Sequence, residues 1–279
     1  MANLYHYTTG AGLLGMMKNY SEENKNLTMW ATHYMYMNDP KEYIYGQDIC
    51  LDIIDEIEKE MGIDEDNRIR KMVTTKEYKN AVKCIKRTPE GRNLNPFLIS
   101  FSQMYDSLHM WDMYAQNGNG IAIQFNAEKV LQSRLNLKEC IYHAETDNSI
   151  KQEIKALYKD LDKEFGNAKT TAEKAVRAHY ISLIISLNKG VRIKHEAYEM
   201  EHEVRITPID KDEVLFRDRK GLMIPYVEQQ IPFECVENII VGPTADFDRV
   251  CESIWLLMNS KGIEWKEDKI IKSKVPYRI

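Results

Sequence analysis

The sequence predicts an α+β protein in which a mixed or antiparallel central sheet carries helical insertions. Short runs rich in β-branched and aromatic residues, such as residues 95–103 and 120–125, recur along the chain and predict strands. Segments with an apolar residue every three or four positions separate these runs and predict helices. There is no repeat, low-complexity tract or linker, so we expect residues 1–279 to form a single α+β domain with helical insertions at about 41–92 and 148–190.

The first strand is predicted in the aromatic run LYHYT at residues 4–8. A short helix follows, and the hydroxyl of Thr8 or Thr9 is placed to cap it. Residues 29–37 alternate loosely and predict a second strand, while residues 41–62 contain isoleucines spaced by four and predict an amphipathic helix.

The middle of the chain is predicted to supply a buried strand at 95–103, a short helix within 107–120 and another strand at 120–125. Asn126 is placed to cap the helix that follows this strand, because its side chain can accept a hydrogen bond from an unpaired backbone amide. A further strand is expected at 139–143.

The second insertion is predicted to contain two helices within residues 148–189. Thr170 and Glu173 form the capping-box pattern at the start of the second of these helices. The rest of the chain is predicted to contain strands at 203–209, 223–231 and 237–242, a helix at 246–262 and strand-like residues at 263–267.

Charge and composition exclude several classes of protein. The net charge of −5 provides no general positive field to hold nucleic acid. No apolar run approaches the roughly 20 residues that cross a bilayer, and the amino terminus lacks the pattern of a secretion signal. The five cysteines are scattered and are not grouped with histidines at zinc spacing. We therefore expect reduced thiols, no metal site, no membrane partner and a cytoplasmic location.

An unusual concentration of charge lies in the run HEAYEMEHEVRITPI, residues 195–209. If this run is a strand, the side chains of Glu201, Glu203 and Arg205 all point to the same face. Two carboxylates on one face repel each other, and Arg205 can offset the repulsion through a bidentate ion pair. Lys194 adds a further cation upstream. Either the group is functional or it is an exposed, salt-bridged edge strand.

Two other strands carry candidate polar groups. In the first strand, His6 points to the face opposite Tyr7 if the residues alternate regularly. In the strand at 95–103, the hydroxyls of Ser100 and Ser102 share one face and suit a polar ligand lying across the sheet. Each pattern also fits ordinary structural residues.

Taken in order, several of these pieces resemble the bacterial DUF2971 family. They are LYHYT, the helix after it, WATHYMYMNDPKE, LISFSQ with Trp111 and Tyr114, GIAIQF, YEMEHEVRI and IIVGP. The resemblance covers roughly residues 4 to 245. The name of this family carries no chemistry, so the resemblance identifies relatives and no reaction.

A more distant likeness is to the ADP-ribosyltransferases. That family carries a His or Arg on its first strand, a Ser, Thr or Tyr on a central strand and a Glu late in the chain. Here His6 is similar to the first position, Ser100 or Ser102 to the second, and Glu201 or Glu203 to the third. The branch with paired glutamates usually begins with Arg, and the long helical insertion between the serines and the glutamates is atypical.

The likeness implies that NAD is the substrate. The ribose would contact His6, a tyrosine such as Tyr34, Tyr36 or Tyr114 would stack on nicotinamide, and a carboxylate would stabilise the cation that forms when nicotinamide leaves. The second carboxylate would act as general base, with Glu203 slightly preferred as the essential one, and Arg205 would hold the diphosphate. The residues implied to be catalytic are Glu203, Glu201 and His6, and those implied to contact NAD are His6, Tyr7, Thr8, Tyr36, Ser100, Ser102, Tyr114 and Arg205.

The expected function is therefore NAD-dependent ADP-ribosyl transfer, or NAD glycohydrolysis, by a toxin or phage-defence effector. The acceptor would be a protein or a nucleic acid. One alternative is a magnesium-dependent nuclease that uses clustered carboxylates. Its residues would be Asp39, Glu42, Glu201 and Glu203, with Lys194 beside them. Another alternative is a non-catalytic nucleotide-binding or regulatory module in which the Glu/Arg strand is a structural ion-pair network.

Overall fold

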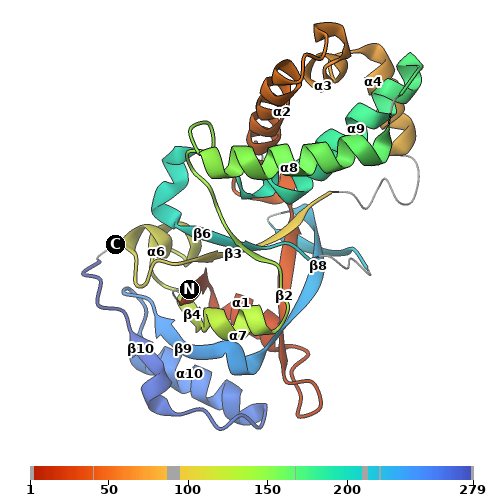
Figure 1. The fold of residues 1–279 in the computed structure, drawn as a ribbon. Coiled ribbons are helices and arrows are strands. Elements are labelled where there is room, and N and C mark those ends of the chain that lie inside the picture. Colours follow the sequence, from red (N-terminus) through yellow and green to blue (C-terminus); the bar gives the residue numbers. More distant parts are fainter. Residues whose placement is uncertain are drawn as a thin grey trace. The chain divides into compact units, whose positions relative to one another are not determined.

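The computed structural model describes residues 3–39, 41–86, 95–166, 168–208, 213–219 and 221–277. It divides into two compact units (Figure 1). Unit 1 comprises Met1–Thr32, Phe97–Glu139 and Glu199–Ile279, and unit 2 comprises His33–Pro96 and Cys140–Tyr198. The described helices of both predicted insertions lie in unit 2.

Unit 1 is built on a mixed sheet, as the sequence predicts. Its strands follow the order β10-β9-β4-β1-β3-β2-β8-β7, and β6 pairs with both β3 and β5. The β10–β9 pair is parallel, and the other pairs with an assigned register are antiparallel. Strands β3 and β2 are neighbours in the sheet. The strands are β1 (Leu4–Thr8), β2 (Asn26–His33), β3 (Phe97–Ser102), β4 (Ile121–Phe125), β5 (Leu137–Glu139), β6 (Glu203–Ile206), β7 (Leu215–Arg219), β8 (Leu222–Pro232), β9 (Val236–Val241) and β10 (Ile270–Lys272).

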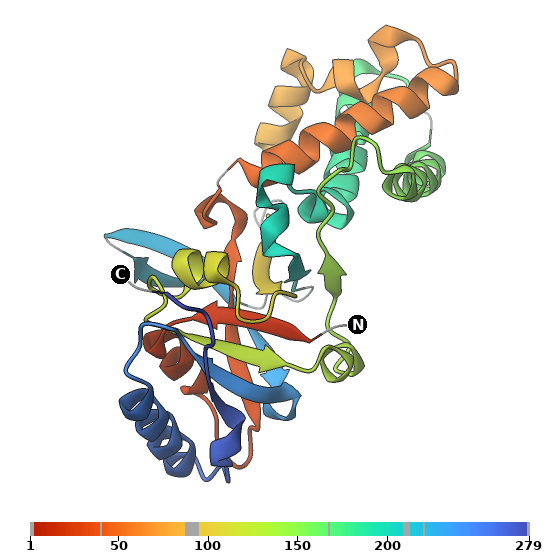
Figure 2. The same ribbon diagram turned by 90° about the vertical axis from the view of Figure 1, so that its left-hand side faces the viewer.

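One face of this sheet forms the main core of unit 1. Leu4, Phe101, Ile123 and Val204 belong to four neighbouring strands and are buried in the same apolar cluster. The helices of unit 1 are α1 (Gly10–Met17), α6 (Leu108–Tyr114), α7 (Ala127–Gln132) and α10 (Phe247–Ser260). Figure 2 shows α10 beside the β9–β10 end of the sheet.

A separate, smaller cluster is centred on Trp111 of α6, which packs with Tyr5 and Tyr7 of β1. These tyrosines alternate with the core residue Leu4, so the cluster lies on the opposite face of the sheet from the main core. The sheet of unit 1 is therefore apolar on both faces near β1.

Unit 2 is helical. Its helices are α2 (Glu42–Glu60), α3 (Ile69–Met72), α4 (Lys76–Ile85), α8 (Asn148–Phe165) and α9 (Thr171–Asn188), followed by the 3-10 turn Gly190–Arg192. They share an apolar core that includes Ile54, Ile154 and Ile181. Helix α2 and the 3-10 turn touch backbone to backbone, because a Cβ on Gly46 would lie 2.1 Å from the carbonyl oxygen of Gly190.

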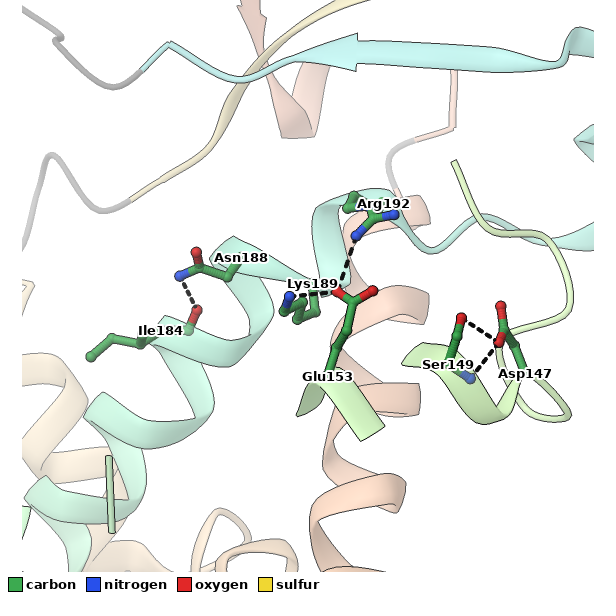
Figure 3. Close-up of polar contacts among 7 residues, drawn as sticks. All are labelled: Asp147, Ser149, Glu153, Ile184, Asn188, Lys189 and Arg192. Carbon is green, nitrogen blue, oxygen red and sulfur yellow. Dashed lines mark hydrogen bonds and ion pairs between the residues drawn. The ribbon is translucent and has the colours of Figure 1, made fainter. Parts of the chain in front are cut away.

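Polar contacts fix the ends of α8 and α9 (Figure 3). The Asp147 carboxylate accepts from the backbone amide and hydroxyl of Ser149, which begins α8 with a capped amide. Glu153 on α8 lies 2.6 Å from the ammonium of Lys189 and 3.4 Å from the guanidinium of Arg192. These ion pairs join the middle of one helix to the segment that follows the other.

Most predicted elements are present within two to four residues of the expected bounds. The capping box is confirmed, since the Thr170 hydroxyl accepts from the Glu173 amide and the Glu173 carboxylate accepts from the Thr170 amide. Thr9, and not Thr8, caps α1, and Asn126 caps α7 as expected.

Three strand predictions need correction, and one strand was not predicted. The strand at 29–37 ends at His33, because the His33 ring accepts from the amide of Met35 and starts a 3-10 turn. In the 139–143 region β5 ends at Glu139, and Ile141 makes only an isolated bridge.

The residues 263–267 do not form a strand. Ile263 and Trp265 are alternately buried in the main core, as strand residues would be, but they have no ladder partner. The actual strand, β10, begins at Ile270. Strand β7 was not predicted, because three of the five residues in LFRDR are charged, a composition typical of loops.

Candidate functional site

The central feature of unit 1 is the pairing of β3 with β6. Ser102 lies directly opposite Glu203, and Ser100 lies directly opposite Arg205. Opposed residues of antiparallel strands point to the same side, and residues two apart along a strand do as well. The four side chains therefore share one face of the sheet, as predicted for each strand separately.

Glu203 and Arg205 form a buried ion pair on that face. The Arg205 Nε donates to Glu203 Oε1 at 2.8 Å, and Nη2 donates to Oε2 at 2.7 Å. Burial lowers the pKa of Arg205 to about 9, so the guanidinium is still a cation at pH 7. Both carboxylate oxygens of Glu203 are engaged in a bidentate contact, which holds the side chain in one orientation.

Glu201 does not lie on the strand, contrary to the prediction that it shares a strand face with Glu203 and Arg205. Strand β6 begins at Glu203, and Glu201 ends a 3-10 turn, Glu196–Glu201. Between them His202 has a φ of +40°, in the left-handed region that ordinary strand residues avoid. The chain therefore turns at His202, and the regular alternation on which the prediction depended starts one residue later.

The carboxylate of Glu201 meets two side chains of α6. The Tyr114 hydroxyl donates to Glu201 Oε1 at 2.6 Å, and Nε2 of His109 lies 3.9 Å from the same oxygen. Glu201 is buried, whereas Tyr114 is half-buried and 32% of the His109 side chain is exposed. This arrangement places a carboxylate, a phenol and an imidazole together where a ligand can reach the last two.

Ser102 holds the turn that carries Glu201. Its hydroxyl donates to the carbonyl of Glu201 at 2.6 Å and accepts from the amide of Met104 at 3.0 Å. Ser102 is fully buried, so its hydroxyl positions the backbone. By contrast, the Ser100 hydroxyl oxygen is buried and has no hydrogen-bond partner in the part of the chain that the structure describes. A buried polar atom without a partner is expected to be satisfied by water or a ligand.

His6 lies on the other face of the sheet. Tyr5 is the residue of β1 opposite Ser102, so Tyr5 and Tyr7 point toward the Ser102 side and His6 points away from it. The His6 Nδ1 contacts the carbonyl of Ser100 at 2.9 Å, and the ring packs edge-on against Phe101 of the core. Burial lowers the pKa of His6, so the ring is neutral at pH 7. The structure does not bring His6 and Glu203 together.

The other residues expected to contact NAD have local structural contacts. The Tyr7 hydroxyl donates to the carbonyl of Met104 and accepts from the amide of Ser107, and burial raises its pKa. Thr8 packs against α1, where Gly12 allows the close approach of the Thr8 hydroxyl. Tyr36 lies in unit 2, where its ring packs edge-on against His33.

The described residues contain no set of three or more His, Cys, Asp or Glu side chains able to hold a metal ion. Asp39 accepts from the backbone amide of Lys41 in unit 2. Lys194, also in unit 2, is buried with its ammonium 4.9 Å from the ring centre of Tyr198. The side chain of Glu42, also expected in the nuclease alternative, lies outside the described part of the chain.

His109 is the site residue that sequence reasoning missed. Trp111 and Tyr114 are three residues apart, a spacing that places two side chains on one helical face, but Trp111 is fully buried in the small cluster and only Tyr114 of the two contacts Glu201. His109 and Tyr114 are five residues apart, which is not a spacing that places two side chains on one helical face. Only the position of the turn before β6 brings both to one carboxylate.

Comparison with known proteins supports the family resemblance. The model of the family described as "Protein of unknown function (DUF2971)" matches residues 110–206. This range contains Tyr114, Glu201, Glu203 and Arg205, so the predicted resemblance is confirmed over much of the site. No curated protein and no solved structure matches the chain. Among the described residues, no helix is both long and apolar enough to cross a membrane.

Proposed function

We propose a reaction from the geometry of the site, because the family matched at residues 110–206 is described without one. The reaction is cleavage of the bond between nicotinamide and ribose in NAD, with transfer of ADP-ribose to water or to a macromolecular acceptor. The observation that supports it is the buried carboxylate of Glu201, which contacts the hydroxyl of Tyr114 and adjoins the partly exposed ring of His109.

Glu201 is the carboxylate best placed to act. Positive charge develops on the ribose as nicotinamide leaves with the bonding electron pair, and a fixed carboxylate in a water-poor site stabilises that charge. The same carboxylate can then accept the proton that the attacking acceptor or water loses. Glu203 is less suited to this role because Arg205 engages both of its oxygens.

The remaining groups have supporting roles. His109 and Tyr114 lie where they can contact the ribose or the nicotinamide amide, and the unpartnered hydroxyl of Ser100 can bind a polar group of the substrate. The Glu203–Arg205 ion pair supplies a fixed dipole on the sheet face that also carries Ser100. His6, on the opposite face, keeps the structural role that its contacts with Ser100 and Phe101 indicate.

The first test measures binding and turnover together. Wild-type protein is incubated with NAD, released nicotinamide is quantified by chromatography, and thermal stability is followed with and without NAD. NAD at 100 times its dissociation constant should stabilise the fold by about 2.7 kcal/mol. A lack of both stabilisation and nicotinamide release, with and without candidate acceptors such as cell extract protein or RNA, would contradict the proposal.

Variants then assign the roles. Glu201→Gln keeps the shape of the side chain and should reduce nicotinamide release by at least about a hundredfold, because the loss of one fixed electrostatic group costs about that factor. Glu128→Gln removes an exposed carboxylate from the first turn of α7 and should leave release unchanged. The control for Tyr114→Phe is Tyr277→Phe, which removes a hydroxyl that donates to Asp112 on the same helix as Tyr114. Equal activity of Glu201→Gln and wild type would show that the carboxylate has no part in the reaction.

The biological role follows from the same proposal. An enzyme that consumes NAD without control would act as a toxin or a phage-defence effector. Expression of the wild-type chain in a bacterial host should then lower cellular NAD and slow growth, while Glu201→Gln should not.

A further inference from the structure

A second polar cluster lies on the three-stranded part of the sheet formed by β2, β8 and β7. The guanidinium carbon of Arg217 is 5.0 Å from the ring centre of Trp30 and 5.7 Å from that of Tyr226, and the two ring centres are 5.2 Å apart. The strand registers place these three side chains, together with Thr32, on the same face. Arg217 Nη2 donates to the hydroxyl of Thr32 at 2.9 Å.

No carboxylate of the described residues forms an ion pair with Arg217. Its Nε is buried and has no hydrogen-bond partner among these residues. Arg219, two residues along the strand on the same face, is exposed and also lacks an ion pair within the described part of the chain. Burial and the neighbouring charge of Arg219 both lower the pKa of Arg217. The acidic residue Glu228 lies opposite Trp30 on this face, and within the described part of the chain it forms no ion pair with either guanidinium.

Two guanidinium groups that repel each other and have no counterion among the described residues are an unusual arrangement for a half-buried position. A structural arginine in such a place is normally neutralised by a carboxylate, because an uncompensated buried charge costs several kcal/mol. Here the fold instead holds Arg217 in place with two rings and a threonine hydroxyl. These contacts fix the orientation of the planar group and do not neutralise it, which prepares it for an anion supplied from outside.

We propose that Trp30, Thr32, Arg217, Arg219 and Tyr226, called here the Arg217 cluster, form a binding site for the phosphate group of a small phosphorylated molecule. A guanidinium presents parallel N–H donors that match two phosphate oxygens, and a second arginine adds charge at the rim. The cluster shares no residue with the Glu201 site, so this inference does not depend on the proposed reaction. The proposed ligand is a small oxyanion and not a polynucleotide.

The test titrates the full-length protein by calorimetry at constant ionic strength. The probes are inorganic phosphate, AMP and adenosine, with sodium chloride as the reference salt. Saturable binding of AMP, with no binding of adenosine, is the expected result. Saturable binding of inorganic phosphate alone would identify free phosphate as the source of the oxyanion and also supports the site. Binding of adenosine as tightly as AMP, or of neither AMP nor phosphate, would overturn the inference, and so would binding of single-stranded RNA alone.

Three variants locate the binding. Arg217→Lys keeps the charge but loses the planar fork, and should weaken phosphate or AMP binding about tenfold or more. Arg219→Gln should weaken it by about threefold, as expected for an exposed charge. Arg249→Gln removes another exposed arginine, which lies on α10 and pairs with Asp246, and should leave the affinity unchanged.

Circular dichroism establishes that each variant is folded. If Arg217→Lys does not fold, Arg219→Gln decides the question, because Arg219 is exposed and its removal leaves no buried group unpaired. Equal affinities of Arg219→Gln and Arg249→Gln, or unchanged affinity in a folded Arg217→Lys, would show that the cluster is a structural stack and no ligand site.

Discussion

Two buried glutamates, one in each unit, accept a hydrogen bond from a tyrosine, and the contrast between them separates a structural carboxylate from a candidate functional one. Glu58 in unit 2 accepts from the Tyr158 hydroxyl at 2.7 Å and from the backbone amide of Ile69 at 2.8 Å, and both Glu58 and Tyr158 are fully buried. Glu201 in unit 1 accepts from Tyr114, which is half-buried, and adjoins the partly exposed His109.

The difference lies in the partners and not in the glutamates. Both carboxylates are removed from water, but the donors around Glu58 are themselves enclosed by the helices of unit 2. Burial raises the pKa of Glu58, and its hydrogen bonds from Tyr158 and Ile69 partly offset that rise. Around Glu201, the two partners are the phenol of Tyr114 and the imidazole of His109, and both are partly exposed. A buried charged group with exposed partners is a better candidate for function than one with buried partners.

Glu203 extends the comparison and gives the largest expected effect. It lies beside Glu201 in sequence but is enclosed like Glu58, with Arg205 on both oxygens. Arg205→Met leaves a buried carboxylate without this partner and should lower the free energy of unfolding by about 3–5 kcal/mol, measured by urea denaturation. The double variant Glu203→Gln with Arg205→Met should recover much of that loss. A single variant as stable as wild type would mean that the pair is solvated.

The matched removal of the two tyrosine hydroxyls tests the comparison directly. Tyr158→Phe leaves one oxygen of the enclosed Glu58 without its donor and should cost about 1–3 kcal/mol of unfolding free energy. Tyr114→Phe should cost less than about 1 kcal/mol, because water can replace the hydroxyl near the surface. Similar losses in both variants, measured by the same denaturation curves, would remove the distinction between the two carboxylates.

Two histidines, the half-buried His6 in unit 1 and the buried His179 in unit 2, predict a smaller effect that depends on pH. Burial lowers the pKa of both His6 and His179 below the ordinary value of 6.5. As the pH falls below 6.5, the unfolded chain therefore binds protons that the folded chain does not, and stability is lost toward acid. The slope is at most about 1.4 kcal/mol per pH unit for each histidine.

Asparagine variants measure this effect. His6→Asn and His179→Asn should each flatten the decrease of unfolding free energy between pH 6.5 and 5, compared with wild type. If neither variant changes the slope, these rings are protonated as readily in the folded chain as in the unfolded one.

Sequence patterns were sufficient for elements whose signals are local. The capping box of α9, the Asn126 cap of α7 and the apolar runs of β3 and β4 each follow from a few neighbouring residues. Strand β7 was not predicted, and residues 263–267 were wrongly predicted to be strand-like. Whether such a segment forms a strand depends on its ladder partners, which lie outside the segment.

The site shows the same limit. Alternation along β3 and β6 correctly placed Ser100, Ser102, Glu203 and Arg205 on one face once the strands were known. The position of Glu201 depends on the left-handed backbone of His202. The residue type at that position does not predict this conformation. The approach of His109 depends on how α6 packs against β1, which is a tertiary property.

The order in which the two units run along the chain has a consequence for folding during synthesis. Both segments of unit 2 are complete at Tyr198, whereas β6, β8 and β9 of unit 1 are still to be made. A ribosome that adds about 5–20 residues per second therefore releases a complete helical unit several seconds before the last strands of the sheet. Ser102 must wait for Glu203 to emerge about a hundred residues later, so the candidate site is assembled near the end of translation and a truncated product would contain unit 2 without it.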